Sequence, residues 1–91
     1  MNKLEAVPVP AEGLTVRQIG KEMIILTDAG EELHTLDETG TFVWSAIDGK
    51  TPLSRILDSI CTEYDVNRNR AQEDLFAFID ALEGKGIISL D

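Results

Sequence analysis

The chain has 91 residues, a length that suits one domain able to fold alone. Hydrophobic residues make up 43% of it, which argues against intrinsic disorder. Its 17 acidic and 8 basic side chains give a net charge of −9, which disfavours nucleic acid and anionic membranes as partners. No apolar run approaches the roughly 20 residues of a membrane helix and no signal peptide is recognisable, so we expect a cytoplasmic protein.

The first 13 residues are expected to form an extended arm, because Pro8 and Pro10 disfavour helix at and before their positions. Residues 14–91 are expected to form the domain itself. Three short antiparallel strands are predicted by β-branched and apolar runs at residues 16–19, 23–26 and 32–36. The middle run does not alternate between apolar and polar residues, so we expect both of its faces to be covered.

Three helices are expected after the strands. Their predicted N-caps are Asp37, Thr51 and Asn67, and the predicted ends are Asp48-Gly49 after the first helix and Gly86 after the third. Pro52 would then occupy the first position of the second helix, where its missing N–H is not needed. The third helix carries a narrow apolar stripe of Ala71, Leu75, Phe78 and Leu82. The side chains on which we expect the core to depend are Trp44, Ile56, Ile60, Leu75, Phe78 and Leu82.

Strands that precede helices predict an α+β fold in which the two kinds of element form separate layers. We expect a winged-helix-like arrangement, with three N-terminal antiparallel strands followed by a three-helix bundle. The apolar tail at residues 87–90 would pack back on the core as an extended piece.

A candidate binding surface lies between the third strand and the third helix. If that strand is a sheet edge, its free backbone groups can accept an added peptide strand. On the third helix, Ala77 and Ala81 are small enough for another backbone to approach, and charged Arg70 and Asp74 flank them. The residues alone do not separate this interpretation from ordinary exposed helix formers beside an edge that acidic side chains protect.

Catalytic chemistry finds no support in the residues. Cys61 and His34 are the only thiol and imidazole groups and lie in different predicted elements, whereas a structural metal site needs about four ligands. No serine has a nucleophile-elbow context, and no glycine-rich phosphate loop is present. We therefore expect neither an enzyme nor a bound cofactor or metal.

The order of these features resembles the family of the pyrroloquinoline quinone biosynthesis protein D. The positions that carry the resemblance, over roughly residues 15–90, are Leu36, Gly40, Trp44, Asp48-Gly49, Tyr64, Asp74, Ala77, Phe78, Leu82 and Gly86. Asp37 departs from it, since relatives commonly carry Asn there. The resemblance implies a ribosomal-peptide recognition element. Such a module binds the leader of a precursor peptide as an added strand and presents it to a modifying enzyme, often a radical S-adenosylmethionine enzyme.

Under this interpretation the peptide-binding residues are expected on the third strand and the third helix. They are Glu32, Leu33, His34, Thr35, Leu36, Arg70, Asp74, Leu75, Ala77 and Phe78. The main alternative is a winged-helix DNA-binding regulator, against which the acidic charge argues. A homodimer formed by strand exchange is permitted but not required by these features.

Overall fold

Three helices and two antiparallel sheets make up the protein in the computed structural model, which describes residues 3–27 and 32–91. In chain order the elements are η1 (Lys3–Glu5), β1 (Pro8–Pro10), β2 (Thr15–Ile19), β3 (Glu22–Leu26), β4 (Leu33–Leu36), α1 (Glu38–Ser45), α2 (Leu53–Tyr64), α3 (Arg68–Gly84) and β5 (Ile88–Leu90). The mixed class and three helices agree with the sequence-based prediction, but five strands form two sheets where three strands were expected. Within the described ranges, no helix has the length and apolar character needed to cross a membrane.

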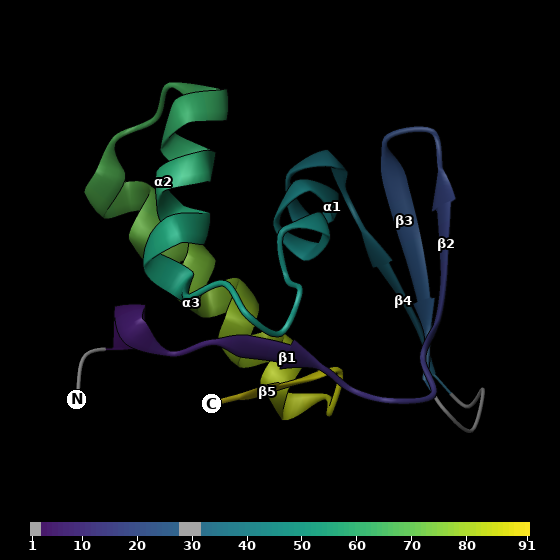
Figure 1. The fold of residues 1–91 in the computed structure, drawn as a ribbon. Helices are drawn as coiled ribbons and strands as arrows, with labels where there is room; N and C mark the ends of the chain where they lie inside the picture. The colour runs from purple at the N-terminus through teal and green to yellow at the C-terminus, as the bar shows by residue number, and fades with distance from the viewer. Residues whose placement is uncertain (1–2, 28–31) are drawn as a thin grey trace.

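The larger sheet has the order β2-β3-β4, so β2 and β4 are its two edges. In Figure 1 it stands at one end of the molecule, and α1 lies between it and the pair formed by α2 and α3. Gly20 makes the β2–β3 turn with a positive φ of 62°, which glycine adopts without steric cost. Met23 and Ile25 are buried, whereas Ile24 and Leu26 are half-buried. The middle strand is thus fully covered on one face only, which corrects the expectation of two covered faces.

The second sheet joins the two ends of the chain. β1 pairs with β5 in antiparallel register, with Val9 opposite Ser89, and the two strands run below α1 and α2 in Figure 1. Backbone bonds link Val7 with Asp91 in both directions, at 3.0 and 2.9 Å. Hydrogen-bonded and non-hydrogen-bonded pairs alternate along such a ladder. Since Val7 and Asp91 are a bonded pair, Pro8 and Pro10 occupy non-bonded positions, where no N–H is needed. The prolines predict extended backbone, but its pairing partner, some 80 residues away, was not predicted.

The predicted N-caps are found with one shift, and α1 ends at Ser45, before the predicted Asp48-Gly49. Asp37 caps α1, and its Oδ1 accepts a hydrogen bond of 2.8 Å from the Gly40 N–H. Asn67 caps α3 as predicted. The second helix, however, has Pro52 as its N-cap, one residue later than expected. Thr51 lies before the helix, where its hydroxyl and N–H both donate to the Asp48 carboxylate.

The core is aliphatic and draws on every helix and on β3, β4 and β5. Its buried members are Met23, Ile25, Leu36, Val43, Ile47, Leu53, Ile56, Leu57, Ile60, Ala71, Leu75, Ile79, Leu82, Ile87 and Ile88. The expected core residues Ile56, Ile60, Leu75 and Leu82 are therefore confirmed. Trp44 and Phe78 were assigned too deep a position, since both are only partly buried against this cluster. On α3 the inward stripe turns toward Ile79, which is 0% exposed, and leaves Phe78 at its margin.

Candidate functional site: a groove between β4 and α3

The outer edge of β4 presents backbone groups that no other strand in the described ranges uses. The N–H of Thr27 donates to the carbonyl of Glu32 at 3.2 Å, which makes residues 27 and 32 a hydrogen-bonded pair. Because such pairs alternate with non-bonded ones, His34 and Leu36 bond to β3, and the N–H and C=O of Leu33 and Thr35 point outward. An extended peptide could therefore pair with β4 at Leu33 and Thr35.

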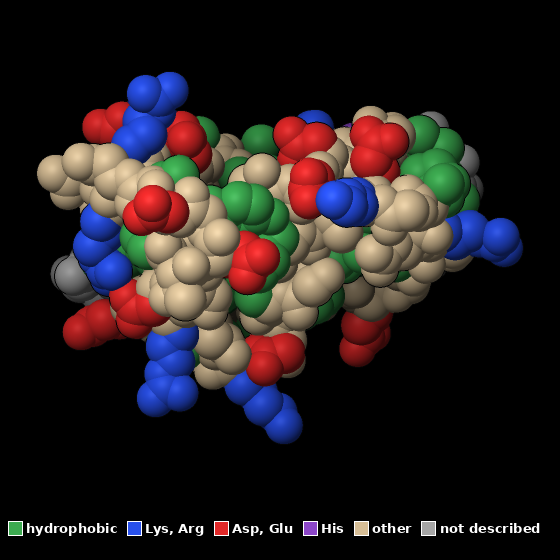
Figure 2. Space-filling view, turned by 90° about the horizontal axis from the view of Figure 1, so that it is seen from above, with side chains coloured by type: hydrophobic (Ala, Val, Ile, Leu, Met, Phe, Trp, Pro, Cys, Tyr) green, Lys and Arg blue, Asp and Glu red, His purple; other side chains and the backbone are tan. Residues whose placement is uncertain are grey.

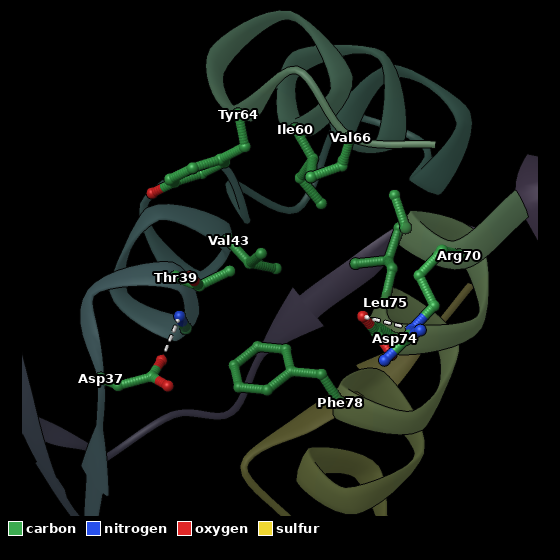
Figure 3. Close-up of a pocket in the computed structure, with 12 residues that line it drawn as sticks. Asp37, Thr39, Val43, Ile60, Tyr64, Val66, Arg70, Asp74, Leu75 and Phe78 are labelled. Atoms are coloured by element: carbon green, nitrogen blue, oxygen red, sulfur yellow. Dashed lines mark hydrogen bonds and ion pairs between the residues drawn. The ribbon is translucent and has the colours of Figure 1, made fainter. Parts of the chain in front are cut away.

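Beside this edge lies an apolar pocket of about 450 Å³, within the range of roughly 300–1,000 Å³ seen for ligand pockets. Its walls come from α1, α2, the α2–α3 loop and α3 (Figure 3). The apolar lining residues are Gly40, Val43, Ile60, Tyr64, Val66, Ala71, Leu75 and Phe78, and the polar ones are Asp37, Thr39, Arg70 and Asp74. Mostly apolar walls with a few polar groups are what a side chain anchored from a bound peptide requires.

A second hollow of about 350 Å³ continues the pocket toward β4. It is lined by Glu22, Thr35, Leu36, Asp37 and Phe78. Asp37 and Phe78 belong to both cavities, so the two are halves of one depression, which we call the β4–α3 groove. It runs from the outward backbone of β4 to the apolar pocket between the helices.

The charged residues of the groove are held loosely. Arg70 and Asp74 form an ion pair one helical turn apart, with Nε 3.7 Å from Oδ2, and both side chains are more than 70% exposed. Exposed pairs of this kind contribute about 0–1 kcal/mol. In Figure 3 this pair lies on the α3 side of the groove and Asp37 on the opposite side. Figure 2 shows acidic side chains spaced around an apolar area on this face of the molecule.

The predicted site residues fall into three groups. Arg70, Asp74, Leu75 and Phe78 line the pocket, and Thr35 and Leu36 line its continuation. Leu33 lies on the same edge with its backbone directed outward. The side chains of Glu32 and His34 lie within hydrogen-bonding distance near the edge, with Nε2 3.1 Å from Oε2, and line neither cavity. Ala77 is exposed on α3 and also lies outside both linings.

The opposite wall of the groove was not predicted. Val43 of α1, Ile60 and Tyr64 of α2, and Val66 after α2 were assigned to the core or left without a role. Their helical periodicity shows only that they face inward. Which inward residues border a cavity depends on how α1 packs against α2. The sequence holds one indication of this wall, since Val66 is an apolar residue between two polar residues of a loop. In the structure its side chain is 43% exposed.

Metal-ligating and nucleophilic side chains are dispersed. Among residues 3–27 and 32–91, no three His, Cys, Asp or Glu side chains are grouped to hold a metal ion. Cys61 is half-buried on α2, and it lines neither cavity of the groove. The groove thus offers backbone hydrogen bonds, apolar contact and charge, which are the means of peptide recognition.

Comparison with known proteins identifies a family and two similar structures. Residues 22–88 match the family described as coenzyme PQQ synthesis protein D (PqqD). The chain belongs to the PqqD family. The matched range takes in β3 and β4, all three helices and the whole lining of the groove. This PqqD-family chain matches no curated protein.

Two solved structures share the fold of this PqqD-family chain. One is TbiB1 in complex with the TbiA(beta) leader peptide, which is 27% identical, with a TM-score of 0.83 over 89% of this chain and 94% of that one. The other is a lasso peptide synthetase B1 complexed with the leader peptide, with a TM-score of 0.80 over 90% of this chain and 96% of that one. The second is 20% identical, and its likeness concerns the fold alone.

Proposed function

We propose that this protein is a non-catalytic recognition module that binds the leader region of a ribosomally made precursor peptide as a strand added to β4. The observation that carries the proposal is the outward backbone of Leu33 and Thr35 at the mouth of an apolar groove. Membership of the PqqD family supports it, as does the similarity to TbiB1, whose structure contains a leader peptide.

The two sides of the groove divide the work of recognition. Hydrogen bonds to Leu33 and Thr35 hold any extended backbone and carry no sequence information. Sequence preference must then come from the side chains that the peptide directs toward α3, where Leu75 and Phe78 offer apolar contact and Arg70 and Asp74 offer charge. Ala77, exposed one turn before Ala81, leaves room for the peptide to pass along the helix.

The module presents the bound precursor to a modifying enzyme in the cytoplasm, and the family suggests the radical S-adenosylmethionine class as one such partner. A homodimer could pair through β2, the other edge of the larger sheet, whose five residues are all exposed. Pairing two copies about the centre of β2 would bring Arg17 opposite its own copy, and like charges directly opposite are destabilising. A dimer paired in this way is therefore disfavoured. No observation favours the DNA-binding alternative.

Selection from a displayed library of random linear peptides, followed by NMR, tests the proposal. A synthetic copy of an enriched peptide is titrated into ¹⁵N-labelled protein. We expect shift changes on residues 32–36 and 70–81, with further changes at the pocket residues of α1 and α2. A library that yields no binder would overturn the proposal, and so would shift changes confined to β2 or to the β1–β5 sheet.

A further inference from the structure

The β4–α3 groove carries more acidic than basic side chains around its apolar lining. Among the residues that the structure describes, Glu22, Asp37 and Asp74 line it, against the single base Arg70. Asp37 uses Oδ1 to cap α1, and its Oδ2 accepts no hydrogen bond from the described residues. Asp37 therefore has one carboxylate oxygen available to a ligand while it holds the helix.

The ring of Phe78 projects from α3 between the two carboxylates nearest the pocket. Figure 3 shows it with Asp37 on one side and Asp74 on the other. A cation above an aromatic ring is attracted by its π-electrons, and nearby carboxylates add to that attraction. A lysine or arginine that crossed Phe78 would meet both kinds of partner.

The protein already binds one of its own lysines in this way. The ammonium of Lys3 lies 5.0 Å from the centre of the Phe76 ring and forms an ion pair with Asp80, four residues further along α3. Asp74 and Phe78 repeat the combination of a ring and a carboxylate four residues apart, with the order reversed. The first combination is occupied by the N-terminal segment, whereas the second opens on the groove.

We infer that the groove selects peptides that carry a lysine or arginine over Phe78, between Asp37 and Asp74, beside a bulky apolar residue in the pocket. The inference rests on the proposed function and specifies the substrate class, a cationic and apolar leader segment. The net charge of −9 would also speed the approach of such a peptide at low salt.

Arg70 does not reverse this preference. Among the described residues of the lining it is the only base, and it already faces Asp74 across 3.7 Å, so its charge is partly compensated within α3. The pair is exposed and weak, and an incoming cation can share Asp74 at little cost. An acidic peptide, in contrast, would meet Asp37 and Glu22 on the β4 side.

The test uses the same random-peptide library and two charge-neutralising variants. Asp37→Asn keeps an oxygen that can cap α1, since Asn and Asp are comparable N-caps. Asp74→Asn removes the second carboxylate. Glu73→Gln is the matched control, because it changes the net charge by the same amount from an exposed position outside the groove lining. Affinities are measured for an enriched peptide and for the same peptide with its basic residue replaced by glutamine.

We expect Lys or Arg to be enriched at a constant distance from a bulky apolar residue. Each Asp→Asn variant should weaken the basic peptide by about two- to fivefold at low salt. The glutamine peptide should respond to neither variant, and Glu73→Gln should leave the preference unchanged. A further variant, Thr35→Pro, removes an outward N–H of β4 and so identifies peptides bound by strand addition. If peptides that lose affinity for this variant show no basic enrichment or show acidic enrichment, the inference would be overturned and the proposed function left intact. An equal response of these peptides to Asp37→Asn, Asp74→Asn and Glu73→Gln would have the same meaning. Peptides insensitive to Thr35→Pro would overturn the proposed function as well.

Discussion

The ring of Phe78 lies against Gly40 in the first turn of α1. A Cβ built at position 40 would come within 3.3 Å of Phe78 Cε1, 3.3 Å of Leu36 Cβ and 3.2 Å of Asp37 Oδ1. Gly40 is helical and does not have a positive φ, so glycine is needed here for space. Its missing side chain lets the aromatic ring of α3 reach the end of β4 and joins the two halves of the groove.

Gly40→Ala should therefore lower peptide affinity, because the new methyl group displaces the Phe78 ring or the Asp37 cap. Gly84→Ala is the control, since a Cβ there has no heavy atom within 4 Å. It should stabilise the protein by about 0.5–1 kcal/mol through helix propensity. Chemical denaturation and peptide titration measure both effects. If Gly40→Ala stabilised equally and bound peptide normally, the contact with Phe78 would have no functional weight.

Adjacent residues of α3 should separate binding from stability. Ile79 is 0% exposed, so Ile79→Ala should lower the free energy of unfolding by roughly 2–5 kcal/mol. Phe78 is only partly buried and lines the groove, so Phe78→Ala should be milder for stability yet lower peptide affinity about tenfold, as at an aromatic hot spot. If Phe78→Ala lowered the free energy of unfolding as much as Ile79→Ala and left peptide binding unchanged, Phe78 would be a core residue, as sequence periodicity alone predicts.

That difference between Phe78 and Ile79 shows what periodicity resolves. The 100° spacing of a helix identifies Ala71, Leu75 and Leu82 as inward. Phe78 and Ile79 both fit the same apolar stripe within its width. Which of them is enclosed depends on α2, which covers one side of the stripe, while the side toward α1 stays open as the pocket. The sequence therefore predicts that α3 contributes to the site, but it does not predict the wall from α1 and α2.

The two sheets differ in how far apart their paired strands lie along the chain, and this decided which pairing could be predicted. The strands β2 to β4 lie close together in the sequence, and each was predicted to within one residue at either end. The pairing of Val9 with Ser89 spans nearly the whole chain, and neither three-residue strand has a pattern that names its partner. The start of α2 also differs from the prediction by one residue. The N–H and hydroxyl of Thr51 donate to the Asp48 carboxylate, and Pro52 is the N-cap residue.

The turn after α1 gives the protein a pH-dependent contribution to stability. Hydrogen bonds from the N–H groups of Lys50 and Thr51, and from the Thr51 hydroxyl, lower the pKa of Asp48 below its ordinary 3.8. A lowered folded-state pKa stabilises the fold above pH 3.8, and this contribution is lost as the pH falls through the folded pKa. Asp48→Asn should thus be less stable than wild type at pH 7, and the difference should shrink in denaturation series below pH 3.8. A difference independent of pH would show that the charge contributes nothing.

Nucleic acid should not bind at physiological salt. With 17 acidic side chains and 8 basic ones, the release of counterions from phosphate, which drives non-specific binding, has little basis here. Fluorescence anisotropy with a labelled random duplex at ~150 mM salt should show no micromolar affinity. Measurable binding at that salt would restore the DNA-binding interpretation of the helices.

The edge of β4 permits a sharper test, because proline can replace either a residue whose N–H points outward or one whose N–H bonds to β3. Thr35→Pro removes an N–H that points outward and leaves the bonds to β3 in place. Prolines are tolerated at such positions on edge strands, and the preceding His34 is already extended, as proline requires. We expect a fold close to wild type and a loss of peptide affinity of at least about tenfold, since one hydrogen bond contributes roughly 0.5–1.5 kcal/mol and the ring also obstructs the added strand.

His34→Pro is the matched control, because it removes an N–H that belongs to the β3–β4 ladder. It should lower the melting temperature, whereas Thr35→Pro should change it little. Circular dichroism melts and titration with a library-selected peptide distinguish the two variants. If Thr35→Pro kept full affinity and a native melt, the peptide would not pair with β4, and the groove would bind its ligand through side chains alone.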